Sequence, residues 1–171
     1  EMKVRIAEGR WRIVGGWWVQ PDCNLPSGEA FVRHGLYSQR YFHEKFGKIS
    51  KVGYNVDSFG HNNNLPQILK KSGMDSYVFM RPMEHEKHMD TNIFEWESPD
   101  GSRVTTFRIP HAYCADFNTK DELDRHIDRI IDECDPEIHE CMGFYGVGNH
   151  GGGPTKKNIG FIKELQAQGG D

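Results

Sequence analysis

The sequence predicts an α/β fold built on a parallel sheet, and three observations indicate it. Strand-like and helix-like segments alternate along the 171 residues. The segment 13–19 is apolar on both faces, which is typical of a parallel strand buried between layers. No repeat, low-complexity tract or Pro/Ser-rich linker interrupts the alternation, so residues 1–171 are expected to belong to one domain without an internal boundary.

The first half of the chain predicts two helices between strands. After the strand 13–19, a helix begins at a Ser27 cap and ends at Gly47. Its inward face repeats at helical spacing, with Leu36 beside it: Phe31, Gly35, Gln39, Phe42 and Phe46. A strand over 52–56 follows.

A short helix over 65–72 and a strand over 77–80 come next. Asn64 stands at the cap position of this helix, Pro66 lies in its first turn and Gly73 lies beyond its end.

The second half predicts a β-hairpin and two further helices. Strands over 93–97 and 103–109 are joined by the turn-forming segment 98–102. Thr119 and Glu122 have the spacing of a capping box, and Pro136 ends the helix that follows. One face of this helix is apolar: Leu123, Ile127, Ile130, Ile131 and Cys134. A strand over 142–147 and a helix over 155–168 complete the pattern.

Composition excludes several classes of partner. The formal net charge is −4 with both signs mixed along the chain, so neither a nucleic acid nor an acidic membrane surface is favoured. No apolar run of about 18 residues is present, which argues against a membrane span. The four cysteines are unevenly spaced, and we interpret them as reduced thiols of a cytoplasmic protein.

Residues 55–61 read Asn-Val-Asp-Ser-Phe-Gly-His and follow directly on a predicted strand. In this position Asp57 suits nucleophilic attack or metal binding, and Phe59 suits the face of a sugar. Two further stretches accompany the motif, Pro-Asp-Cys-Asn-Leu-Pro-Ser-Gly-Glu at 21–29 and Gly-Asn-His-Gly-Gly-Gly-Pro-Thr at 148–155. Together and in this order, they resemble the catalytic domain of glycoside hydrolase family 38, the zinc-dependent retaining α-mannosidases.

The resemblance implies a fold and an activity. The fold would be part of a seven-stranded (β/α) barrel with parallel strands, and the activity would be hydrolysis of terminal α-mannosides in mannose metabolism. The chain begins at Glu1 and stops just past a predicted helix, which suggests an internal segment of a longer polypeptide. The lack of a targeting signal in the sequence favours a bacterial-type enzyme. Asp57 would be both the nucleophile and a zinc ligand. Phe59 would lie against the sugar, and Arg81 would support the carboxylate.

Pattern alone places four polar residues just beyond predicted strand ends. These are Asp22, Asp57, Arg81 and Asn149. Because the carboxyl ends of parallel strands meet at one edge, the four are expected to share a rim and to contact substrate. In the family, an acidic residue just before the glycines of the 148–155 stretch transfers the proton. Here Asn149 and His150 occupy that region, so His150 or Asp116 is the candidate acid/base.

Zinc ligands are scarce in this chain. The family takes a His-x-Asp pair from its first barrel strand and a further histidine, but no His-x-Asp occurs in the first predicted strand, 13–19. Catalytic zinc needs about three protein ligands, so the isolated chain is expected to be inactive and to lack stoichiometric zinc. His61 is interpreted as a hydrogen-bond anchor, and the segments 85–90 and 111–114 are interpreted as loops without a metal.

Two alternatives stay open. A metal-dependent carbohydrate deacetylase of related barrel fold would need a paired histidine motif beside the aspartate, and none is found. A non-catalytic carbohydrate-binding module would bind mannose without hydrolysis.

Trp17 and Trp18 are expected in the barrel core, and incomplete closure of the barrel would leave exposed sheet edges through which the chain self-associates.

Overall fold

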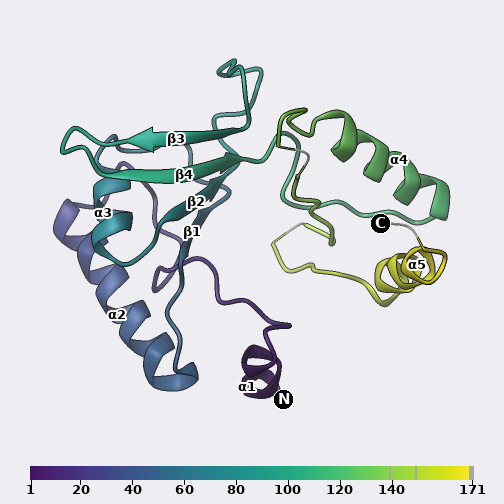
Figure 1. Ribbon diagram of the computed structural model, residues 1–171, viewed down its shortest axis with the longest axis horizontal. Coiled ribbons are helices and arrows are strands. Elements are labelled where there is room, and N and C mark those ends of the chain that lie inside the picture. The colour runs from purple at the N-terminus through teal and green to yellow at the C-terminus, as the bar shows by residue number, and fades with distance from the viewer. Residues whose placement is uncertain (139, 149, 170–171) are drawn as a thin grey trace. The chain divides into compact units, whose positions relative to one another are not determined.

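The computed structural model describes residues 1–138, 140–148 and 150–169, and it divides into two compact units. The first is Glu1–Ile109 and the second is Pro110–Asp171. Figure 1 shows the first in purple to teal and the second in green to yellow. The two units are described separately below, and the expectation of a single domain stays a prediction.

The first unit is built on a four-stranded, mostly parallel sheet in the order β1-β2-β4-β3. Strands β1 (Val52–Asn55), β2 (Ser76–Phe79) and β4 (Arg103–Arg108) run parallel, while β3 (Ile93–Glu97) pairs antiparallel with β4 as the predicted hairpin. Helices α2 (Gly28–Phe46) and α3 (Leu65–Lys71) pack beside one another next to the sheet (Figure 1). Helix α1 (Met2–Ala7) contacts α2. The α/β class with a parallel sheet is therefore confirmed.

One apolar cluster fills the space between the sheet and its helices. Its buried members come from both layers: Trp17, Cys23, Phe31, Leu65, Leu69, Met74, Tyr77, Phe79 and Val104. Helix α2 contributes through one face only, so Phe31, Gly35 and Gln39 are buried as expected, whereas Leu36 is exposed. Burial of one side chain such as Leu69 contributes about 1.5–3 kcal/mol to the free energy of unfolding. The cluster therefore holds the helices against the sheet.

The prediction of a strand over 13–19 is wrong. Only Gly15 forms a bridge, parallel to Gly53, and the pairing goes no further. Gly15 and Gly16 have φ values of 101° and 69°, which turn the backbone out of the extended conformation. Trp17 is buried after this turn, but Trp18 is 58% exposed and does not belong to the core. The apolar run thus marks one buried side chain between two turns.

Most of the predicted helix ends are found. Ser27 Oγ accepts a hydrogen bond from the Ala30 N–H, and Gly47 ends α2 in the left-handed conformation. The cap of α3 differs from the expectation, because the Asn64 side chain makes no capping bond. Instead the side chain of Asn62 accepts from the N–H of Asn64.

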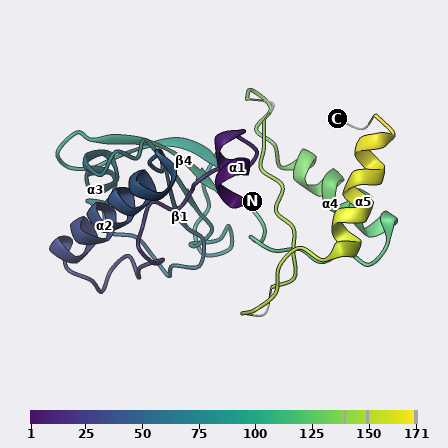
Figure 2. The same ribbon diagram turned by 90° about the horizontal axis from the view of Figure 1, so that it is seen from below.

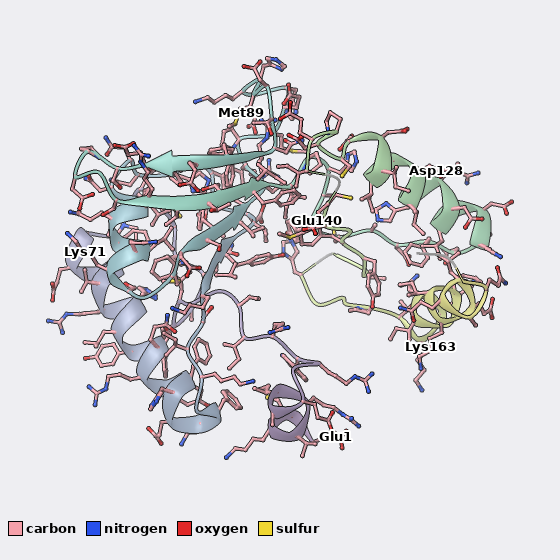
Figure 3. The ribbon with its side chains drawn as sticks, viewed as in Figure 1. Glu1, Lys71, Met89, Asp128, Glu140 and Lys163 are labelled. Carbon is pink, nitrogen blue, oxygen red and sulfur yellow. The ribbon has the colours of Figure 1, made fainter. Side chains whose placement is uncertain are left out.

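In the described part of the second unit, irregular chain joins two helices (Figure 2). Helix α4 (Lys120–Asp132) begins at Thr119, whose Oγ1 accepts from the Glu122 N–H. The reciprocal half of the predicted box is absent, because the Glu122 carboxylate accepts from Asn118 instead. The apolar face is also narrower than predicted, since Ile131 is 60% exposed.

Helix α5 (Lys156–Ala167) has a complete capping box formed by Thr155 and Asn158. The strand predicted over 142–147 is wrong. Gly146 alone forms a bridge, antiparallel to Ala115, and its φ of 124° prevents a regular strand on either side. Gly146 therefore interrupts strand pairing in this segment.

Candidate functional site

The strand register brings Asp57 and Arg81 together. In the parallel pair β1–β2, Asn55 lies opposite Phe79, so Asp57 and Arg81 are equivalent positions two residues beyond the two strand ends. Arg81 Nε donates to Asp57 Oδ1 at 3.2 Å. Both side chains remain partly exposed, at 41% for Asp57 and 29% for Arg81. The carboxylate is therefore oriented by a cation and still open to a ligand.

Phe59 completes this cluster at the surface. The guanidinium carbon of Arg81 lies 4.7 Å from the centroid of the Phe59 ring, within the range of a cation–π contact. The ring itself is 75% exposed. An exposed aromatic beside a carboxylate and a cation is an arrangement that suits the apolar face of a sugar.

His61 is partly buried and ends the segment that carries Asp57 and Phe59. Its Nε2 is 2.6 Å from the carbonyl oxygen of Arg81, and its Nδ1 is 3.0 Å from the hydroxyl of Tyr77. Burial lowers the pKa of His61, although the hydrogen bond to the Arg81 carbonyl opposes this shift. The interpretation of His61 as a hydrogen-bond anchor is confirmed.

Asp22 stands in a separate turn that is tied to the same strand end. Its Oδ1 accepts from the backbone N–H groups of Asn24 and Leu25, and these two bonds lower the pKa of the carboxyl group. The side-chain amide of Asn55, at the end of β1, donates to the carbonyl oxygen of Pro21 at 3.0 Å. This bond holds the turn next to the loop that carries Asp57. One carboxylate oxygen of Asp22 is occupied by hydrogen bonds to its own turn.

Sequence reasoning did not single out the buried polar groups that support this region. They form a hydrogen-bonded set with Pro21: Trp17, Cys23, Asn55, Ser58 and Tyr77. Asn55 carried one usable signal, because a polar residue inside an apolar strand must find partners when it is buried. The others look like ordinary core residues in the sequence.

The remaining predicted residues belong to the second unit. Exposed His150 has a φ of 59° and lines an open hollow of about 300 Å³. The rest of the lining comes from the glycine loop, which we define as Gly148 and Gly151–Gly153, and from residues near it: Tyr113, Cys114, Tyr145, Gly146 and Val147. Asp116 is exposed and accepts from Asn158 Nδ2 at 3.3 Å. Asn149 lies outside the described residues. The roles of all three stay predictions.

The described residues do not complete a zinc site. Within the described part of the chain, no group of three or more His, Cys, Asp or Glu side chains is placed to hold a metal ion. Asp57 is paired with Arg81 instead. His88 Nδ1 contacts the Glu84 carboxylate, and His111 Nε2 lies 2.6 Å from Glu133 Oε2 without the geometry of a hydrogen bond. Asp57 alone falls short of the three ligands of catalytic zinc.

None of the helices in the described ranges combines the length and the hydrophobicity needed to cross a lipid bilayer.

Comparison with known proteins decides the family. The sequence profile described as "Glycosyl hydrolases family 38 N-terminal domain" matches residues 1–170. The chain belongs to glycoside hydrolase family 38. Asp57, Phe59 and Arg81 are therefore the exposed cluster of a family 38 chain, and the family expected from the three motifs is confirmed.

Two curated relatives of this family 38 chain are named as α-mannosidases. Alpha-mannosidase G of Dictyostelium discoideum is 34% identical over 157 residues, which is 90% of this chain and 14% of the relative. The alpha-mannosidase of Saccharomyces cerevisiae is 30% identical over 166 residues, covering 95% and 15%. The chain thus spans about one seventh of the length of these relatives.

A solved structure supports the fold of the family 38 chain. An alpha-mannosidase from Enterococcus faecalis V583 matches with a TM-score of 0.76 at 18% identity. The match covers 98% of this chain and 19% of the other. At this identity the likeness concerns the fold alone, and it agrees with the mixed α/β arrangement around the four-stranded sheet.

Proposed function

We propose that this chain is the nucleophile-bearing segment of a retaining α-mannosidase that hydrolyses terminal α-mannosides. The observation that carries the proposal is the Asp57–Arg81 pair at the carboxyl ends of β1 and β2, with the exposed ring of Phe59 beside it. Its membership of family 38 and its α-mannosidase relatives supply the substrate class. In this proposal the chain is part of one catalytic domain, and β1, β2 and β4 are strands of a seven-stranded barrel.

The geometry of the side chains supports the chemistry that this proposal assigns to the chain. Asp57 attacks the anomeric carbon and forms a glycosyl ester, which water then hydrolyses with retention. Arg81 fixes the attacking carboxylate, and Phe59 covers one face of the sugar. A second group about 5–5.5 Å from the nucleophile gives a proton to the leaving oxygen and later takes one from water.

We propose His150 or Asp116 for the proton transfer, and Asp22 and Asn149 as polar contacts to the sugar. His150 projects from a glycine-rich loop beside an open hollow, which is where a ligand can approach the backbone closely. Asp116 is held by α5 through Asn158. A cytoplasmic location and self-association through exposed edges accompany the proposal as further predictions.

Zinc belongs to the proposal for the longer enzyme only, in which Asp57 would be the ligand that this chain supplies. We expect the purified 171-residue chain to bind zinc weakly and without one-to-one stoichiometry, because the described residues provide no set of three ligands. Isothermal titration with zinc, alongside an assay with an aryl α-mannoside, measures this. Micromolar or tighter binding at one site together with hydrolysis would contradict the account.

Covalent trapping tests the proposed function directly. A mannosyl fluoride that carries a second fluorine on the ring slows both steps, and its reactive leaving group still allows the first, so the glycosyl ester accumulates. After digestion of the α-mannosidase that contains this chain, we expect the labelled peptide to include Asp57. A label on another carboxylate would show that Asp57 is not the nucleophile. Inactivation by the reagent without a label on Asp57 would show the same.

A further inference from the structure

A short chain of hydrogen bonds leads from the core to the main chain of Arg81. It starts at Tyr77, which has no exposed surface and whose hydroxyl lies 3.8 Å from Cys23 Sγ and 3.0 Å from His61 Nδ1. It continues across the imidazole ring of His61 and ends at the carbonyl oxygen of Arg81, 2.6 Å from Nε2. These hydrogen bonds therefore connect the end of the loop that carries Asp57 to the end of β2.

Chemistry fixes the direction of each bond. A carbonyl oxygen only accepts, so Nε2 of His61 carries the hydrogen and donates to Arg81. In the neutral ring Nδ1 then accepts, and the Tyr77 hydroxyl donates to it. Burial lowers the pKa of His61 and raises that of Tyr77, and both shifts favour the neutral forms that this direction requires.

Aromatic neighbours hold the His61 ring in one orientation. Its centroid lies 4.8 Å from that of Phe79, 5.6 Å from that of Tyr77 and 6.0 Å from that of Trp96, in each case with the rings steeply inclined. These contacts come from β2, whose residues are mostly buried, and from the partly exposed strand β3. The position of Nε2 is thus set by the core.

We propose that His61 is a positioning residue for the Asp57–Arg81 pair. By binding the Arg81 carbonyl, it fixes the main chain from which the guanidinium reaches both Asp57 Oδ1 and the face of Phe59. Loss of that bond lets the Arg81 main chain shift, and the nucleophile loses its orientation while the core remains folded. The role in catalysis rests on the proposed function, but the effect on Arg81 does not.

Two amide substitutions separate the two ends of the ring. His61→Gln extends an amide donor about as far as Nε2, so it keeps the bond to Arg81. His61→Asn places its amide near Nδ1, so it keeps the bond to Tyr77 and loses Arg81. Phe94→Leu serves as the packing control, because Phe94 contacts Phe79 in the same cluster without belonging to the hydrogen-bonded chain. Thermal unfolding of each variant checks that it is folded.

The first readout needs no activity. In the 171-residue chain, ¹H–¹⁵N spectra are expected to show His61 as the Nε2–H tautomer and a protected Arg81 Nε–H signal from the bond to Asp57. That Arg81 signal should persist in His61→Gln and in Phe94→Leu, and disappear or shift to the position of a free guanidinium in His61→Asn. An Arg81 signal that is unchanged in His61→Asn would overturn the proposal.

The second readout is kinetic and uses the α-mannosidase that contains the chain. His61→Asn is expected to lower kcat roughly 10–100-fold, as supporting residues of a site do, with little change in KM. His61→Gln should recover most of kcat. Equal losses in both variants would overturn the positioning role. Failure of the proposed function would be recognised separately, by absent hydrolysis and trapping while the Arg81 signal still responds to His61→Asn.

Discussion

Replacing Asp57 with asparagine is expected to lower kcat for an aryl α-mannoside by roughly 10⁴-fold or more in the enzyme that contains this chain. The amide cannot form the glycosyl ester, and it no longer offers a charged partner to the guanidinium of Arg81. The loss should lie in kcat, because the proposed contact between Phe59 and the sugar does not involve the carboxylate. Steady-state kinetics over a range of substrate concentrations separate the two parameters.

Asp75→Asn is the matched control for this experiment. Asp75 is an exposed aspartate just before β2, at the opposite end of the strand from Arg81, and the same change of charge there should leave kcat within about two-fold. An Asp57→Asn enzyme that kept more than a few per cent of wild-type kcat would show that another carboxylate attacks the sugar.

The second large effect is expected at Gly152 in the glycine loop. A Cβ atom at this position would lie 2.1 Å from the carbonyl oxygen of Val147 and 2.4 Å from that of Gly148. Both atoms are main chain, so relief requires the loop itself to move, at a cost of about 1–3 kcal/mol or more. Gly152→Ala should therefore displace the wall of the hollow beside His150 and reduce turnover sharply.

Gly151→Ala tests whether the effect is steric. A Cβ at Gly151 meets nothing within 4 Å, so the neighbouring substitution changes composition without a clash. Thermal unfolding and kcat should resemble wild type for Gly151→Ala and fall for Gly152→Ala. If the two variants behaved alike, close backbone packing in this loop would not govern its function.

Local rules in the sequence were sufficient for helices α2 and α3, for strands β1 to β4 and for the position of Asp57. The Ser27 and Gly47 signals fixed the ends of α2, and the hairpin of β3 and β4 followed from two strand patterns around a turn. Asp57 was found from a motif at the end of a strand. These features depend on residues close together in the chain, whose propensities, caps and turns act independently of the rest of the fold.

The two misassigned strands show what the tertiary structure decided. The segments 13–19 and 142–147 contain enough apolar residues for strands, but glycines with positive φ limit each of them to one bridge. Glycine adopts positive and negative φ at similar cost, so the sequence does not specify which one it takes. The surrounding tertiary structure decides the φ value at these glycines. The same limit applies to Trp18, whose exposure follows from the turn before it.

The site divides in the same way. The sequence by itself determined which residue types stand beyond β1 and β2: the carboxylate of Asp57, the ring of Phe59 and the cation of Arg81. Only the tertiary structure decided that the parallel register sets Asp57 beside Arg81, and that His61 joins Tyr77 to the Arg81 carbonyl. Such contacts join residues far apart in the chain, and a hydrogen bond is specified by distance and direction, which no spacing along a sequence contains.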